Sequence, residues 1–222
     1  MEQDSVRKKL LEHLARARLA FGQERMIVAV DGVDGSGKTT FADELAVVLE
    51  TTGQSVIRAS VDGFHHPREV RYLRGKDSPV GYFLDSYDYD IFKRDLLLPF
   101  RSGAGIVQTA RFDHRNNREV TSAFAEPDTR SVLVIDGIFL HRDELADCWD
   151  LSIFLDVPFA VSYARMAARD GSNPDPHAPE NHRYLEGQCL YLQRCNPGDR
   201  AMILIDNADL NAPRISREKP VG

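Results

Sequence analysis

The stretch "GVDGSGKT", residues 32–39, decides the fold. It fits the pattern Gly-x-x-x-x-Gly-Lys-Ser/Thr, follows the apolar run "MIVAV" (26–30) and precedes a helix-length segment at 38–52. Glycines let the backbone curl so that its N–H groups point at phosphate oxygens, and a helix N-terminus adds positive potential. The order of strand, loop and helix therefore predicts a phosphate-binding loop that holds ATP.

The residue types within this loop predict separate roles. Lys38 is expected to reach the β and γ phosphates, and the Thr39 hydroxyl is expected to ligate Mg²⁺. The predicted ATP-binding residues are Gly35, Ser36, Gly37, Lys38, Thr39 and Thr40.

Outward from the loop, strand and helix patterns alternate along the chain. Further apolar runs lie at 55–61, 131–135, 151–155 and 201–205, and helix-length segments lie at 4–20, 88–99, 141–149, 159–169 and 178–195. Short apolar strands separated by helices predict an α/β fold with a parallel five-stranded sheet flanked by helices. Residues 171–180 and the tail from about 211 are expected to be mobile.

Length and composition indicate one domain over residues 1–222. The piece from 62 to 130 is too long for a simple crossover, and we interpret it as an acceptor-binding insertion. The net charge of -6 argues against nucleic-acid binding. The chain shows no membrane-length apolar run and starts with a charged helical segment, which together predict a cytoplasmic protein. The oligomeric state stays open, a homo-oligomer included.

Each predicted strand ends at an aspartate, namely Asp31, Asp62, Asp136, Asp156 and Asp206. The carboxyl ends of parallel strands form the ligand edge of such a sheet, although an aspartate there often only starts a loop or caps a helix. Asp136 follows a clean apolar run, which favours a second Mg²⁺ ligand. Asp62 opens the insertion and is a candidate to accept the proton of an attacking hydroxyl.

Charged side chains elsewhere suggest a lid and leave one question open. Arg165 and Arg169 share a helical face and precede the Pro-rich stretch, so they are expected to close over the γ-phosphate from a lid at 165–183. A solvated helix face is the alternative. Arg68, Arg71 and Arg74 either bind an anionic acceptor or form a solvated stripe. His65 and His66 lack the further ligands that a metal site needs.

Together these motifs resemble the uridine kinase and phosphoribulokinase group of P-loop kinases, over residues 26–206. The resemblance rests on "GSGKTT" (35–40), "VDGFHHP" (61–67), "SYDYDIF" (86–92), "RFDHRNNRE" (111–119), "LVIDGIFL" (133–140), "RMAARD" (165–170) and "DRAMILIDNADL" (199–210). It implies that Asp62 is the catalytic base, with Phe64 and His65 beside the acceptor. It also implies acceptor contacts by Asp88, which falls on the ribose-binding aspartate, and by Phe112 and His114.

The group's activity would be Mg²⁺- and ATP-dependent phosphorylation of a primary hydroxyl on a small-molecule acceptor, here a uridine- or cytidine-like nucleoside. Two departures weaken the choice of acceptor, because Tyr89-Asp90 stands for the group's His-Pro and Arg111 for an aromatic residue. A phosphosugar or a pantothenate-like alcohol therefore remains an alternative acceptor. A P-loop switch without an acceptor and a non-catalytic nucleotide sensor are the rival classes.

Overall fold

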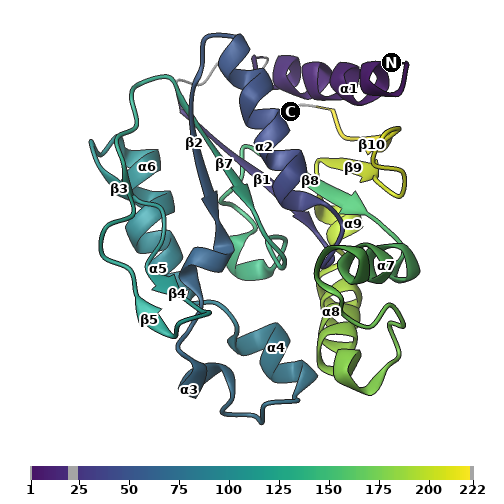
Figure 1. Ribbon diagram of the computed structural model, residues 1–222. Helices are drawn as coiled ribbons and strands as arrows, with labels where there is room; N and C mark the ends of the chain where they lie inside the picture. Colours follow the sequence, from purple (N-terminus) through teal and green to yellow (C-terminus); the bar gives the residue numbers. More distant parts are fainter. Residues whose placement is uncertain (1, 20–24, 221–222) are drawn as a thin grey trace.

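The computed structural model describes residues 2–19 and 25–220 and places a six-stranded sheet at the centre (Figure 1). The strands are Met26–Gly32 (β1), Ser55–Ser60 (β2), Ser131–Asp136 (β7), Leu151–Asp156 (β8), Ile203–Asp206 (β9) and Arg214–Glu218 (β10). Their order is β10-β9-β8-β1-β7-β2, and all of them except β10 are mutually parallel. The five predicted strands and the α/β fold are confirmed.

The sixth strand corrects the expectation of a mobile tail from about residue 211. β10 pairs antiparallel with β9 at the edge of the sheet. Its sequence "RISRE" alternates exposed and half-buried residues and carries three charges. The strand is short and charged and has no continuous apolar run, as is typical of edge strands. Hydropathy alone does not distinguish such a strand from a polar tail.

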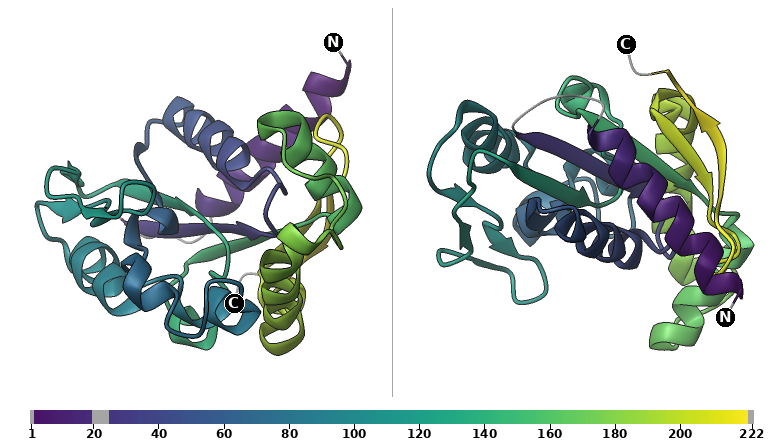
Figure 2. Two further views of the ribbon diagram at one scale, coloured as in Figure 1. Left: turned by 60° about the horizontal axis from the view of Figure 1, so that its bottom comes forward. Right: turned by 90° about the horizontal axis from the view of Figure 1, so that it is seen from above.

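One face of the sheet is covered by two helices, α1 (Glu2–Leu19) and α2 (Lys38–Thr51). Alternate strand residues such as Val28, Val30 and Val134 point to this face and pack with Leu14 of α1 and Leu45 of α2. α2 crosses in front of the sheet in Figure 1, and α1 lies across the sheet in the right panel of Figure 2. Residue 20, the last of the helix predicted at 4–20, lies outside the described residues.

The other face is covered by the insertion and by α8 (His182–Cys195), whose Tyr191 belongs to the same buried cluster as Ile27 and Leu133 of the sheet. The insertion contains a 3-10 turn Val61–Phe64 (η1), α3 (Arg68–Arg71), α4 (Pro79–Asp85), α5 (Tyr89–Phe92), a π-helical turn Lys93–Leu97 (η2) and α6 (Leu98–Ser102). Two small antiparallel sheets complete it, β3 (Val107–Gln108) with β6 (Phe124–Ala125) and β4 (Phe112–Asp113) with β5 (Arg118–Glu119). It occupies the left and bottom of Figure 1.

The carboxyl-terminal helices are α7 (Phe159–Asp170), a 3-10 turn Pro179–Asn181 (η4), α8 (His182–Cys195) and α9 (Pro197–Arg200). The helix predicted at 141–149 was wrong, because only a 3-10 turn Asp143–Leu145 (η3) forms there. The Trp149 indole N–H donates to the carbonyl of Leu140 at 2.8 Å, and Arg200 donates to the carbonyl of His141 at 3.1 Å. These tertiary bonds fold the segment into a compact loop.

Strand order determines which strand ends meet. β7 lies between β1 and β2, and Asp136 is in register with Val30 on one side and Ser60 on the other. The phosphate-binding loop, Asp136 and the start of η1 therefore lie side by side at one edge of the sheet. This is the edge where open parallel sheets bind ligands.

Candidate active site

The phosphate-binding loop has the curled backbone that its glycines predict. Gly35 has φ 74° and Gly37 has φ 91°, in the left-handed region that residues with a Cβ avoid. At Gly35, a Cβ would also clash with the carbonyl oxygen of Ser162 in α7. The Lys38 ammonium donates to the Val33 carbonyl at 2.8 Å. Glycine is therefore required at position 35, because a side chain there would be strained and would collide with α7.

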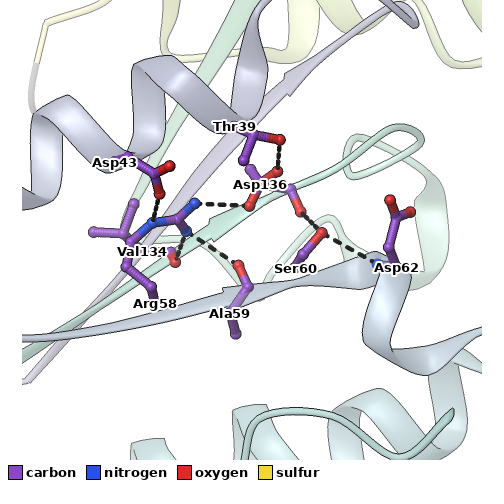
Figure 3. Close-up of polar contacts among 8 residues, drawn as sticks. All are labelled: Thr39, Asp43, Arg58, Ala59, Ser60, Asp62, Val134 and Asp136. Atoms are coloured by element: carbon purple, nitrogen blue, oxygen red, sulfur yellow. Dashed lines mark hydrogen bonds and ion pairs between the residues drawn. The ribbon is translucent and has the colours of Figure 1, made fainter. Parts of the chain in front are cut away.

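Thr39 and Asp136 lie together, as predicted for a shared Mg²⁺ site. The Thr39 hydroxyl donates to Asp136 Oδ2 at 2.7 Å, and Asp136 is 4% exposed (Figure 3). Hydroxyl and carboxylate oxygens are the hard donors that Mg²⁺ prefers. The residues present fit that ion.

Arg58 is a member of the site that the sequence did not single out. It extends from β2 and donates to Asp136 Oδ1 at 2.8 Å and to Asp43 Oδ1 at 2.9 Å (Figure 3). It also donates to the Val134 carbonyl. A single arginine inside the apolar run "SVIRASV" was the available signal, because a charge at such a position needs a partner.

Asp62 lies at the start of η1, directly after β2. The Ser60 hydroxyl accepts from the Asp62 backbone N–H at 3.3 Å and donates to the Asp136 carbonyl at 3.1 Å, which links the two strand ends (Figure 3). The Tyr87 hydroxyl donates to Asp62 Oδ1 at 2.8 Å. Asp62 is otherwise exposed, so its carboxylate faces open space.

That space is a pocket of about 750 Å³ between the phosphate-binding loop, the insertion and α7. Six of the predicted functional side chains or loop residues line it, namely Gly35, Lys38, Thr39, Asp62, His114 and Asp136, together with Arg169 of the predicted lid. Its lining also includes residues that sequence reasoning missed, namely Asp34, Arg115, Tyr163, Met166 and Tyr184. The arrangement brings the glycine-rich loop, two oxygens suited to Mg²⁺ and an exposed carboxylate to one cavity.

Asp34 of the loop is held by residues from two distant elements. The Tyr82 hydroxyl of α4 donates to Asp34 Oδ2 at 2.7 Å, and the Asp34 backbone N–H donates to Gln188 Oε1 of α8 at 2.7 Å. Burial and the Asp34 charge raise the pKa of Tyr82 well above its ordinary value, so it stays a donor. The insertion and α8 are thereby attached to the phosphate-binding loop.

Four other predicted acceptor residues line a separate cavity of about 100 Å³, namely Phe64, His65, Asp88 and Phe112. Asp88 caps α5 by accepting from the Ile91 N–H at 2.9 Å, so the structure does not bring it into the large pocket. The His65 ring stacks on His114 with centroids 4.4 Å apart and connects the two regions. Burial lowers the pKa of His65 to about 4, which keeps the ring uncharged near neutral pH.

The two predicted lid arginines have different partners. Arg165 donates to the carbonyls of Asn207 and Ala208, both at 2.8 Å, and the described lining of the pocket does not include it. It anchors the loop after β9 to α7, while Asn207 in turn donates to the Ser36 carbonyl at 2.7 Å. Arg169 does line the pocket and forms an ion pair with Asp170 at 2.8 Å.

The three arginines that could either bind an anionic acceptor or form a solvated stripe are engaged elsewhere or face solvent. Arg74 pairs with Asp85 at 2.9 Å, Arg71 donates to the His66 carbonyl at 2.9 Å, and the exposed Arg68 lies on α3. The described lining of the pocket includes none of the three. In residues 2–19 and 25–220 there is no cluster of three metal-ligating side chains and no helix that could span a membrane.

Comparisons with known proteins agree with this fold and indicate a family. The profile of the Phosphoribulokinase / Uridine kinase family matches residues 27–173. A uridine kinase of Leuconostoc citreum is 28% identical over 156 residues, which cover 67% of this chain and 70% of that protein.

Two solved structures have the same fold. A possible uridine kinase of Bacillus stearothermophilus superposes with TM-score 0.70 at 22% identity, covering 87% of this chain and 96% of that one. A putative fructose transport system kinase of a Silicibacter species superposes with TM-score 0.62 at 27% identity, covering 79% and 93%. By its motifs, its site and the family profile, this chain belongs to the phosphoribulokinase/uridine kinase family of kinases.

Proposed function

We propose that this protein transfers the γ-phosphate of ATP to a primary hydroxyl of a nucleoside of the uridine or cytidine type. The observation that carries the proposal is the convergence of Lys38, the Thr39–Asp136 pair and the exposed Asp62 carboxylate on one pocket of about 750 Å³. A switch that only hydrolyses ATP has no need of the aromatic- and histidine-lined insertion beside that carboxylate.

The mechanism follows from where these groups lie. Asp62 takes the proton of the acceptor hydroxyl while the oxygen of that hydroxyl attacks the γ-phosphorus. The bond between the γ-phosphorus and the β–γ bridging oxygen breaks, and ADP leaves. The proton then passes from Asp62 to water. Lys38 would orient the β and γ phosphates. Thr39 and Asp136 would hold Mg²⁺, which neutralises phosphate charge when bound. The backbone N–H groups around Gly35 and Gly37 would bind the phosphate oxygens.

The test is a screen of the purified protein for acceptor-dependent ADP release with nucleosides, pentose phosphates and vitamin-like alcohols. The proposal expects ADP release to depend on a nucleoside and a phosphorylated nucleoside to accumulate. ADP release that no acceptor changes would favour the switch. If no nucleoside but another alcohol is phosphorylated, the nucleoside acceptor is refuted while the kinase activity is supported.

A phosphosugar is the second candidate acceptor, and one side chain favours it. Arg115 lines the pocket, and within the described residues its guanidinium has no hydrogen-bond or ion-pair partner, although its backbone N–H donates to Asp113. A free guanidinium is suited to a phosphate monoester. If the acceptor carries a phosphate, Arg115→Gln should raise its KM by about tenfold or more. Arg118→Gln, which removes a neighbouring exposed arginine paired with Asp113, is the control.

A further inference from the structure

We infer that Tyr87 is a positioning residue for the phosphoryl transfer, because its hydroxyl holds and stabilises the Asp62 carboxylate. The inference rests on the proposed role of Asp62 as the base. The Tyr87 hydroxyl donates to Asp62 Oδ1 at 2.8 Å. In the described part of the chain, no other donor contacts that carboxylate, so Oδ2 is left for the acceptor hydroxyl.

The position of Tyr87 is fixed by its backbone. Residues 64–66 and 86–88 form a short antiparallel bridge, in which the Asp88 N–H donates to the Phe64 carbonyl at 2.8 Å and the His66 N–H donates to the Ser86 carbonyl at 2.9 Å. This bridge joins the segment that follows η1 to the link between α4 and α5. It brings Tyr87 next to the turn that carries Asp62.

The ring of Tyr87 is fixed by packing as well. Tyr87 is 5% exposed, and its ring lies 4.4 Å from His65 and 6.3 Å from Phe139, measured between centroids. A buried ring with two torsions has little freedom to move its hydroxyl. The donor is therefore pre-organised before any substrate binds.

The chemistry of the contact suits a base that must stay ionised and oriented. Burial and the Asp62 charge raise the pKa of Tyr87 well above its ordinary value, so the hydroxyl remains a neutral donor over the working pH range. A hydrogen bond to a carboxylate favours its charged form. It also fixes the plane of the carboxylate, so that the second oxygen points in one direction. Without it, the Asp62 carboxylate would lose its one side-chain donor among the described residues and rotate more freely.

The chain offers a matched control two residues away. Tyr89 is also buried, at 8% exposed, and its ring lies 6.0 Å from that of Tyr87. Its hydroxyl has no hydrogen-bond partner among the described residues. Tyr89→Phe therefore removes the same atom from the same aromatic cluster without touching Asp62.

The experiment compares wild type, Tyr87→Phe and Tyr89→Phe in acceptor-dependent turnover across about pH 5 to pH 9. Tyr87→Phe should lower kcat by about tenfold, leave the KM for ATP unchanged, and move the acidic limb of the pH–rate profile up by about one pH unit. Tyr89→Phe should behave as wild type. Equal pH profiles for the two variants would overturn the inference, even if both are slower than wild type.

A second measurement does not need activity. The side-chain carboxyl carbon of Asp62, assigned with Asp62→Asn, is followed by NMR as the pH is lowered. We expect it to titrate at a higher pH in Tyr87→Phe than in wild type and Tyr89→Phe. Identical titrations would refute the inference. If the wild type itself shows no acceptor-dependent turnover, the proposed function is refuted. The NMR titration would still test whether Tyr87 stabilises the Asp62 carboxylate.

Discussion

At the level of single residues, the carboxylate of Asp136 is a buried charge, because this residue is only 4% exposed. A buried charge is tolerated only when it is paired and hydrogen-bonded. Here Thr39 and Arg58 each donate to one of its oxygens. The guanidinium of Arg58 is itself held by Asp43 and by the Val134 carbonyl, so the group forms a connected network.

Arg58→Leu should therefore destabilise the fold. It leaves Asp136 buried with one donor fewer, and removing one partner of a buried pair costs up to about 3–5 kcal/mol, less here because Arg58 keeps 25% of its side chain exposed. We expect about 2 kcal/mol less free energy of unfolding, measured in urea. Arg74→Leu breaks an ion pair whose arginine is 54% exposed and should cost under about 1 kcal/mol. Equal losses would show that the burial of Asp136 does not matter.

Asp62→Asn should separate catalysis from ATP binding. The amide cannot take up the proton of the acceptor hydroxyl, so turnover should fall by about 10²–10⁴-fold, while the loop that we propose to bind ATP is unchanged. Lys38→Ala should impair both, because Lys38 belongs to the phosphate cradle. Turnover and ATP affinity, by kinetics and calorimetry, check the two variants. Retention of more than about a tenth of wild-type turnover in Asp62→Asn would mean that another group is the base.

At the level of elements, the insertion is held against α8 by a close helix contact. A Cβ at Gly187 of α8 would lie 2.6 Å from Tyr82 Cδ1 and 3.0 Å from the Pro79 carbonyl of α4. Tyr82 also donates to Asp34 of the phosphate-binding loop. The distance between α4 and α8 therefore affects the position of Tyr82, and with it the contact between the insertion and the phosphate-binding loop.

Gly187→Ala should accordingly be destabilising, although alanine is the better helix former. Overpacking costs about 1–3 kcal/mol, which outweighs the propensity gain of up to about 1 kcal/mol. Gly198→Ala in α9 meets only Leu204 at 3.8 Å and should be neutral or slightly stabilising. Thermal unfolding of the two variants gives the comparison. A melting temperature of Gly187→Ala at or above that of Gly198→Ala would contradict the close contact.

At the level of the whole molecule, we expect His65 to make the free energy of unfolding depend on pH. Burial lowers its pKa from 6.5 to about 4, so the unfolded chain binds a proton before the folded one does. The stability is therefore complete above about pH 6.5 and declines as the pH falls toward 4, by up to about 3 kcal/mol.

His65→Phe should flatten this decline, because the ring no longer titrates. His177→Gln, at an exposed position, should leave it unchanged. Urea unfolding at intervals between about pH 7 and pH 4 measures the slope. An unaltered slope in His65→Phe would show that other groups set the acid sensitivity.

Local patterns of the sequence determined most of the sheet and the nucleotide end of the site. The apolar runs at 26–30, 55–61, 131–135 and 151–155 each carry their own strand signal. A loop of the kind at 32–39 would bind phosphate through its own backbone, so its glycines and Lys38 could be proposed for this role without knowing the fold. Asp62 and Asp136 could be named because strand ends of a parallel sheet share an edge.

Only the tertiary structure determined which residues contact the candidate site residues. Strand order placed β7 between β1 and β2, which put Asp136 beside both Thr39 and Ser60. The hydroxyl of Tyr87 reaches Asp62 from 25 residues away, and β10 becomes a strand only because β9 offers an open edge. Such contacts join residues remote in sequence, and a local pattern carries no information about them. The sequence therefore named the groups that we propose to react, and the fold determined which residues hold them in place.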